Sequence, residues 1–114
     1  MSYKAKSAEM RAELRVMNRL IPATAAGFAD LSKAAKTEGS LSVKEREYVA
    51  LAIAITQHCE PCIGFHIEAL QKTDATREDL AALMSMCIQM GGGPALMYAA
   101  HALAAWDEMA EPPA

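Results

Sequence analysis

The strongest constraint on the fold is that helix-forming residues fill almost every segment between a few helix-breaking positions. Ala, Leu, Met, Glu and Lys dominate these segments, and all five are good helix formers. The pattern is interrupted at Pro22, Gly39 and Pro61 and again by Gly-Gly-Gly-Pro at residues 91–94. No segment shows the apolar–polar alternation typical of a strand. The sequence therefore predicts an all-α fold of about six helices.

Capping residues and these breaks set the expected helix boundaries. Ser42 and Glu45 have the spacing of a capping box, and Thr76 and Asp79 repeat that spacing further along. Pro61 suits the first turn of a helix, because the N–H that proline lacks would have no partner there. We expect helices over residues 7–18, 21–37, 43–57, 59 or 60 to 72, 77–90 and 94–109.

Length, charge and composition narrow the class of protein. A chain of 114 residues is expected to form one domain, over residues 1–114. The net charge is −3 and no run of Lys or Arg follows the first turns, which argues against nucleic-acid binding. No apolar stretch approaches the roughly 20 residues of a membrane span, and the polar start lacks the apolar region of a signal peptide. We expect a cytoplasmic protein that binds neither nucleic acid nor membrane.

Methionine content bears on assembly. The chain is 53% hydrophobic but only 5% aromatic, and it contains eight methionines. Methionine is flexible and common at adaptable contact surfaces. Part of the apolar surface is therefore expected to be buried between subunits.

The segment HCEPCIGFH, residues 58–66, holds two of the three cysteines and two of the three histidines. On one helix, Cys59, Cys62 and His66 share a face, because residues three and four apart are neighbours. The unpaired N–H groups and the dipole at a helix N-terminus favour a thiolate. His66 is placed to take a thiol proton directly or through a water. The pattern therefore favours a redox-active thiol pair. A structural disulfide framework is not expected in the cytoplasm, where free thiols stay reduced.

Glu47 is the best candidate to orient His66. It lies near the start of the apolar part of the helix over 43–57, which we expect to be buried on all sides. A buried carboxylate is costly without a partner. Glu45 is engaged in the cap, and Glu68 points away from the Cys62–His66 face.

Three further residues receive other interpretations. We expect His58 in the turn before the helix, outside the site, and His101 at a subunit interface or on the surface. Cys87 lies among methionines and is expected to be a packing thiol. Zinc binding by the two motif thiols and His66 is an alternative, with Glu47 or His58 as fourth ligand, but structural zinc sites usually draw ligand pairs from separate elements. We therefore expect neither a metal nor a cofactor.

The spacing of Glu47, Cys59, Cys62 and His66 resembles that of the alkylhydroperoxidase D-like group in the carboxymuconolactone decarboxylase superfamily. The likeness continues through HCEPCIGFHIEAL and MGGGPALMYAAHAL, and it covers residues 41–109. The resemblance implies an all-helical protein that assembles as trimers or hexamers.

The same resemblance implies a thiol-dependent peroxidase. By analogy, Cys62 attacks a hydroperoxide, Cys59 resolves the sulfenic acid as a disulfide, and His66 with Glu47 relays protons. The reductant would be a lipoyl group or another dithiol. The best-known peroxidases of the group carry a histidine directly before the second cysteine, where this chain has Pro61. A decarboxylase-like enzyme is a further alternative, although the decarboxylase branch generally lacks the cysteine pair.

Overall fold

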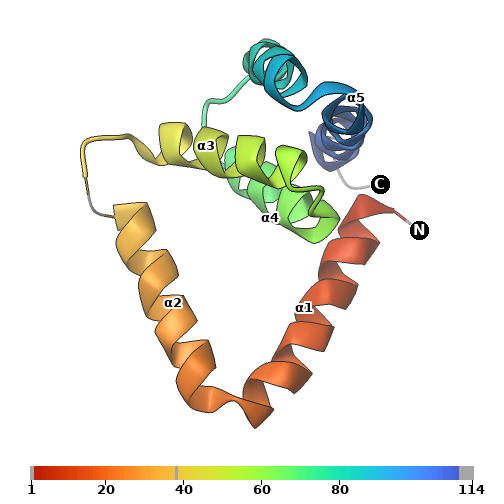
Figure 1. Ribbon diagram of the computed structural model, residues 1–114. Helices are drawn as coiled ribbons and strands as arrows, with labels where there is room; N and C mark the ends of the chain where they lie inside the picture. The colour runs from red at the N-terminus through yellow and green to blue at the C-terminus, as the bar shows by residue number, and fades with distance from the viewer. Residues whose placement is uncertain (1, 38, 111–114) are drawn as a thin grey trace.

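The computed structural model describes residues 2–37 and 39–110, and throughout these ranges the regular structure is helical, without strands (Figure 1). The all-α prediction is therefore confirmed. The helices are α1 (Tyr3–Leu20), α2 (Pro22–Thr37), α3 (Val43–Thr56), α4 (Glu60–Leu70) and α5 (Arg77–Ala110).

The largest difference between the expected and the observed helix bounds is at the start of α1. α1 begins before the predicted start at residue 7, because the Ser2 side chain caps it by accepting the Ala5 N–H at 3.0 Å. The two helices expected over 77–90 and 94–109 are both present and carry the single label α5; a kink at Gly92, whose backbone is not helical (φ 70°, ψ −151°), separates them. Glycine reaches this backbone conformation without a Cβ penalty, so the chain turns there without an intervening loop.

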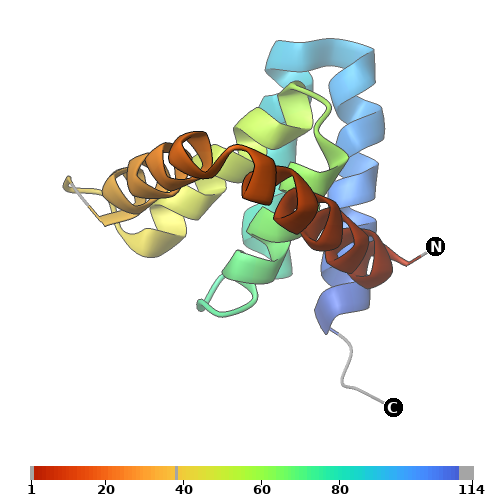
Figure 2. The same cartoon turned by 90° about the horizontal axis from the view of Figure 1, so that it is seen from below.

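Helices α3, α4 and α5 pack together into the core, and α1 and α2 extend from it as the two limbs of a V (Figure 1). Figure 2 shows α1 crossing α4, with its first turn close to the end of α5. The Tyr3 N–H donates to Glu108 Oε2 at 2.8 Å there. The largest fully buried side chains are those of Leu51, Ile55, Ile63, Ile67, Leu70 and Leu80.

The expectation that α3 is buried on all sides is wrong for the single chain. Leu51 and Ile55 face the core, but Val49 and Ile53 are 51% and 49% exposed. α3 is covered by α4 and α5 on one side, and only the end of α2 reaches it otherwise, so its opposite face remains open (Figure 1).

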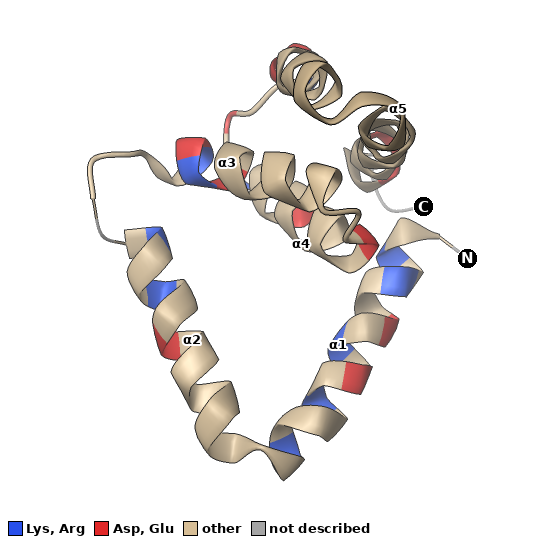
Figure 3. Ribbon diagram, in the orientation of Figure 1, with Lys and Arg blue, Asp and Glu red and all other residues tan. Residues whose placement is uncertain are grey.

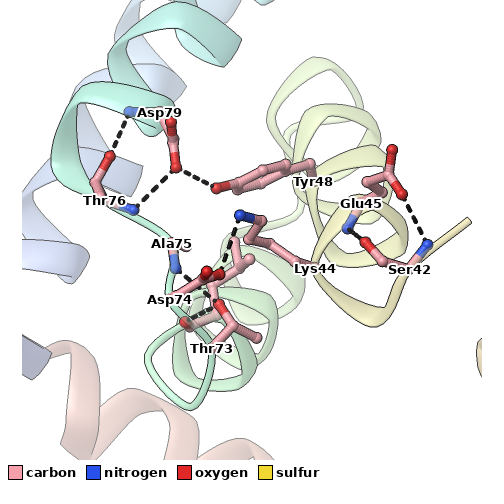
Figure 4. Close-up of polar contacts among 10 residues, drawn as sticks. Ser42, Lys44, Glu45, Tyr48, Thr73, Asp74, Ala75, Thr76 and Asp79 are labelled. Carbon is pink, nitrogen blue, oxygen red and sulfur yellow. Dashed lines mark hydrogen bonds and ion pairs between the residues drawn. The ribbon is translucent and has the colours of Figure 1, made fainter.

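A polar cluster joins the start of α3 to the start of α5 (Figure 4). The Tyr48 hydroxyl donates to Asp79 Oδ2 at 2.8 Å, and burial together with this bond raises the pKa of Tyr48 to about 12. Lys44 Nζ lies 3.0 Å from Oδ1 of Asp74, which lies in the loop between α4 and α5. Both predicted capping pairs are present: Ser42 bonds reciprocally with Glu45, and Thr76 with Asp79. The network fixes the packing of α5 on the helix that carries Glu47.

α5 is long and apolar enough to cross a membrane by length and composition, which differs from the expectation that no stretch of the chain could do so. It has no Lys, Arg, Asp or Glu between Asp79 and Asp107 (Figure 3). The core helix of a soluble protein can be equally long and apolar. α5 supplies eight buried residues, among them Leu80, Ala95 and Ala102. The absence of a membrane contact remains a prediction.

Candidate redox site

Cys59 and Cys62 lie at the beginning of α4, as the helix-terminus interpretation requires. Cys59 is the N-cap residue, and its Sγ accepts the Cys62 N–H at 3.3 Å. The two cysteines are joined by a disulfide, with 5.2 Å between their Cα atoms. Pro61, in the first turn between them, is exposed and has no N–H to donate. The spacing thus brings both sulfur atoms to one helix end.

The end of α3 places Cys59. The Cys59 N–H donates to the Ala54 carbonyl at 3.0 Å, and the His58 N–H donates to the Ile55 carbonyl at 3.3 Å. These two bonds form a Schellman motif, in which the residue after the cap takes a left-handed conformation. His58 is that residue, with φ 58°. Cys59 therefore closes α3 and opens α4, so both helix ends fix its backbone.

His66 lies one turn beyond Cys62 and meets Glu47 across the α3–α4 contact. The distance from His66 Nδ1 to Glu47 Oε2 is 2.6 Å, and Glu47 is only 5% exposed. An ionised carboxylate only accepts hydrogen bonds, so this contact places the imidazole proton on Nδ1 and leaves the Nε2 lone pair available as a base. Lys36 Nζ, on α2, lies 3.9 Å from Glu47 Oε1.

The other carboxylates near the motif have separate partners. Glu45 Oε1 accepts the Ser42 N–H at 2.8 Å. Glu68 Oε2 accepts from Arg11 on α1 at 2.9 Å. Neither approaches His66, so of these three carboxylates only Glu47 reaches the imidazole.

One open pocket, about 260 Å³ in volume, connects the predicted site residues. Its lining is largely apolar apart from the sulfur atoms, the imidazole and one amide. Glu47 lies behind His66 rather than in the lining. The lining residues are Ala50, Ile53, Ala54, Gln57, Cys59, Cys62 and His66.

The remaining sequence candidates lie outside this pocket. Cys87 is 3% exposed in the core, where burial raises the pKa of its thiol. His58 and His101 are exposed, and each contacts the ring of Tyr98 between them. Within residues 2–37 and 39–110, no group of three or more His, Cys, Asp and Glu side chains is arranged to hold a metal ion.

Sequence reasoning missed three residues near the site. Lys36 and Gln57 gave no signal, because their proximity depends on how α2 and α3 pack against the motif. Tyr98 precedes His101 by three residues, which puts both rings on one helix face. That spacing was the available signal for Tyr98.

Comparison with known proteins agrees with this architecture. The family model described as "Carboxymuconolactone decarboxylase family" matches residues 22–105. The crystal structure of an apo carboxymuconolactone decarboxylase family protein from Legionella pneumophila superposes with a TM-score of 0.91 and 38% identity, covering 96% of this chain and 97% of that one.

Two similar relatives have no described function. An uncharacterized protein of Cupriavidus necator is 36% identical over 106 residues, which is 93% of this chain and 94% of that protein. An uncharacterized protein from the cox locus of Paracoccus denitrificans is 30% identical over 82 residues, 72% of this chain and 74% of the relative. The fold and the cysteine pair define a helical protein of the alkylhydroperoxidase D-like superfamily. The chain belongs to the carboxymuconolactone decarboxylase family.

Proposed function

We propose that the protein is a thiol-dependent peroxidase or dithiol–disulfide oxidoreductase that reduces hydroperoxides. One observation carries the proposal: the disulfide-linked Cys59 and Cys62 share a pocket with His66, whose imidazole is held by the buried Glu47. A partner thiol beside a positioned base is the arrangement that thiol redox chemistry requires.

The reaction begins with the reduced pair. His66 takes the proton of the Cys62 thiol, and the thiolate attacks the peroxide oxygen. The O–O bond breaks, and the alcohol or water leaves with the proton returned by His66. Cys62 is then a sulfenic acid, and its S–O bond breaks when the Cys59 thiolate attacks the sulfur. The proton given up by Cys59 leaves with the hydroxide as water, and a Cys59–Cys62 disulfide remains.

A dithiol donor, such as a lipoyl-type group, closes the cycle. Its thiolate attacks the disulfide to give a mixed disulfide, and its second thiol then displaces the protein sulfur. The two protein sulfurs regain protons as the donor becomes a disulfide. The open, largely apolar pocket beside Ile53 gives such a donor access.

Pro61 stands where a second proton carrier would otherwise lie. It occupies the position where the better-known peroxidases of this group carry a second histidine. Pro61 has no titratable group, so protons in the pocket must pass through His66 and water. We expect slower peroxide reduction than a site with two imidazoles would support.

The residues present favour redox chemistry over the alternatives. Decarboxylation of a small acid calls for a cationic group to hold the carboxylate, and the pocket lining contains neither Arg nor Lys. A structural zinc site would need further ligands beside the two thiols, and within the described residues no three His, Cys, Asp and Glu side chains are arranged to hold a metal ion.

We also propose that the protein is a cytoplasmic homotrimer or homohexamer. Large apolar side chains are exposed on the single chain along α1, α2 and the open face of α3. Extensive exposed apolar surface marks an interaction site, and a second copy of the chain would cover it. The residues concerned are Val16, Met17, Leu20, Phe28, Leu31, Val49 and Ile53.

The test is a peroxide-consumption assay on the reduced protein with hydrogen peroxide and an alkyl hydroperoxide. We expect about one equivalent consumed per chain without a donor, with closure of the Cys59–Cys62 disulfide, and turnover when a dithiol is added. Cys62→Ser removes the attacking thiolate, whereas Cys87→Ser is the matched control in the core. Turnover by Cys62→Ser would contradict the assignment. Zinc bound near stoichiometrically to protein purified without chelator would favour the alternative.

A further inference from the structure

His58 occupies a position that normally belongs to glycine. In a Schellman motif the residue after the helix cap is left-handed, usually Gly, because other side chains are disfavoured there. Among the described residues, His58 is the only non-glycine residue with positive φ, at 58°. It directly precedes the N-cap Cys59. A strained conformation next to a functional residue requires surrounding contacts that maintain it.

The ring of His58 has such a contact. It stacks on Tyr98 of α5, with 4.8 Å between centroids and 23° between planes. Tyr98 is held in turn by His101, whose ring meets it edge-on at 5.3 Å. The Tyr3 hydroxyl lies 3.0 Å from His101 Nδ1, so the rings of His58, Tyr98 and His101 are linked to the start of α1. Two separate helices, α5 and α1, thus contribute to the contacts that hold the turn carrying Cys59.

We propose that His58 is a positioning residue for the first motif cysteine, acting through its stack on Tyr98. The stack keeps the left-handed turn closed when the disulfide is open. Cys59 Sγ then stays at the beginning of α4, where it accepts the Cys62 N–H at 3.3 Å in the oxidised chain. This inference rests on the redox role proposed for the cysteine pair.

The expected consequence is a higher effective concentration of Cys59 at Cys62. In the disulfide form the S–S bond itself restrains the turn. In the dithiol form that restraint is gone, so the two backbone bonds and the ring stack alone hold it. Loss of the stack loosens only the dithiol form, and closing the disulfide then costs more ordering. The disulfide therefore becomes easier to reduce.

The experiment measures the equilibrium constant for forming the Cys59–Cys62 disulfide in the folded chain at the expense of glutathione disulfide. The reduced and oxidised fractions are counted by thiol alkylation and mass spectrometry. His58→Asn keeps a residue that tolerates the left-handed turn but removes the ring. Tyr98→Leu removes the other half of the stack, and Tyr98→Phe retains it. We expect both ring-removing variants to lower the constant about fivefold, the range an aromatic pair supplies. That change equals about 20 mV for a two-electron couple.

Two controls separate positioning from general stability. Tyr48→Phe loses the distant bond to Asp79 and should destabilise the fold without moving the constant. The double variant His58→Asn, Tyr98→Leu should shift the equilibrium constant no further than either single change, because each single change already removes the same ring stack.

The inference is overturned by an unchanged constant in His58→Asn, by equal shifts in Tyr98→Phe and Tyr98→Leu, or by a shift in Tyr48→Phe of the same size. Failure to form any Cys59–Cys62 disulfide overturns it as well. The assay contains no peroxide, so a chain without peroxidase activity still yields a constant. A failed peroxidase assignment is thereby distinguished from a failed positioning role.

Discussion

Glu47 and His66 lie on different helices, 19 residues apart, and meet with 2.6 Å between Oε2 and Nδ1. Glu47 is buried on α3, while His66 on α4 faces the pocket that contains both motif sulfurs. The contact fixes the tautomer and the direction of the imidazole. The packing of α3 on α4 therefore determines how the His66 imidazole is oriented in the pocket that Cys59 and Cys62 also line.

Replacing Glu47 by Gln should lower the rate of peroxide reduction about 10²-fold, because the amide no longer stabilises a protonated His66. The shape of the side chain is kept, so the far-UV circular dichroism should match that of the native chain. The measurement is single-turnover peroxide consumption by the reduced protein.

Glu45→Gln is the matched control for that change, on the same helix. Glu45 closes the cap with Ser42 and does not contact His66. The Glu45→Gln variant should reduce peroxide within about twofold of the native rate, while the N-terminal cap of α3 weakens. Equal losses in both variants would show that α3 stability, not the Glu47 charge, controls the reaction.

The local features of this fold were predictable from sequence, because they depend on neighbouring residues. The pairs Ser42 with Glu45 and Thr76 with Asp79 form the expected caps. The break within Gly-Gly-Gly-Pro was predictable too, but its form was not, because these residues suit a loop as well as the single kink that the conformation at Gly92 produces.

The candidate site divides in the same way. The shared face of Cys59, Cys62 and His66 follows from helical spacing, and the choice of Glu47 followed from the cost of burying an unpaired carboxylate. The stack of His58 on Tyr98 depends on how α5 crosses the end of α3. Such a contact is tertiary and leaves no local pattern.

The bond between Tyr48 and Asp79 predicts a loss of stability at alkaline pH. The folded pKa of Tyr48 is about 12, above the ordinary value of 10.0, mainly because of burial. Between those values the unfolded chain loses the phenol proton and the folded chain keeps it. The stabilisation is thus complete below pH 10 and disappears as the pH approaches 12.

Tyr48→Phe isolates this effect, since every other titrating group is common to both chains. The difference in free energy of unfolding between the native chain and the variant should be about 1 kcal/mol at neutral pH. It should shrink steadily above pH 10, as urea denaturation at each pH will show. A constant difference across that range would contradict the proposed titration.

Gly64 allows α1 to approach α4 closely. A Cβ at this position would lie 2.6 Å from Ser7 Oγ, well inside contact distance. Gly64→Ala should therefore cost about 1–3 kcal/mol of unfolding free energy despite the better helix propensity of Ala. Adding Ser7→Ala removes the hydroxyl and should recover part of that loss, as measured by chemical denaturation.

Gly27 provides the matched control, because nothing lies within 4 Å of a Cβ built there. Gly27→Ala, in the middle of α2, should stabilise the protein by up to about 1 kcal/mol through helix propensity alone. Stabilisation by Gly64→Ala would mean that α1 moves away from α4 without cost.

The exposed side chains of α2 lead to a prediction about assembly. Phe28 and Leu31 are 69% and 64% exposed, and α2 has no buried residue in the single chain. Burying the side chains of Phe28 and Leu31 between copies of the chain would supply the apolar contact that α2 otherwise lacks. Phe28→Glu and Leu31→Glu should each reduce the mass measured by light scattering, whereas Lys33→Glu, which changes charge but removes no large apolar group, should reduce it less. A native mass equal to one 12.2 kDa chain would contradict the proposed trimer or hexamer.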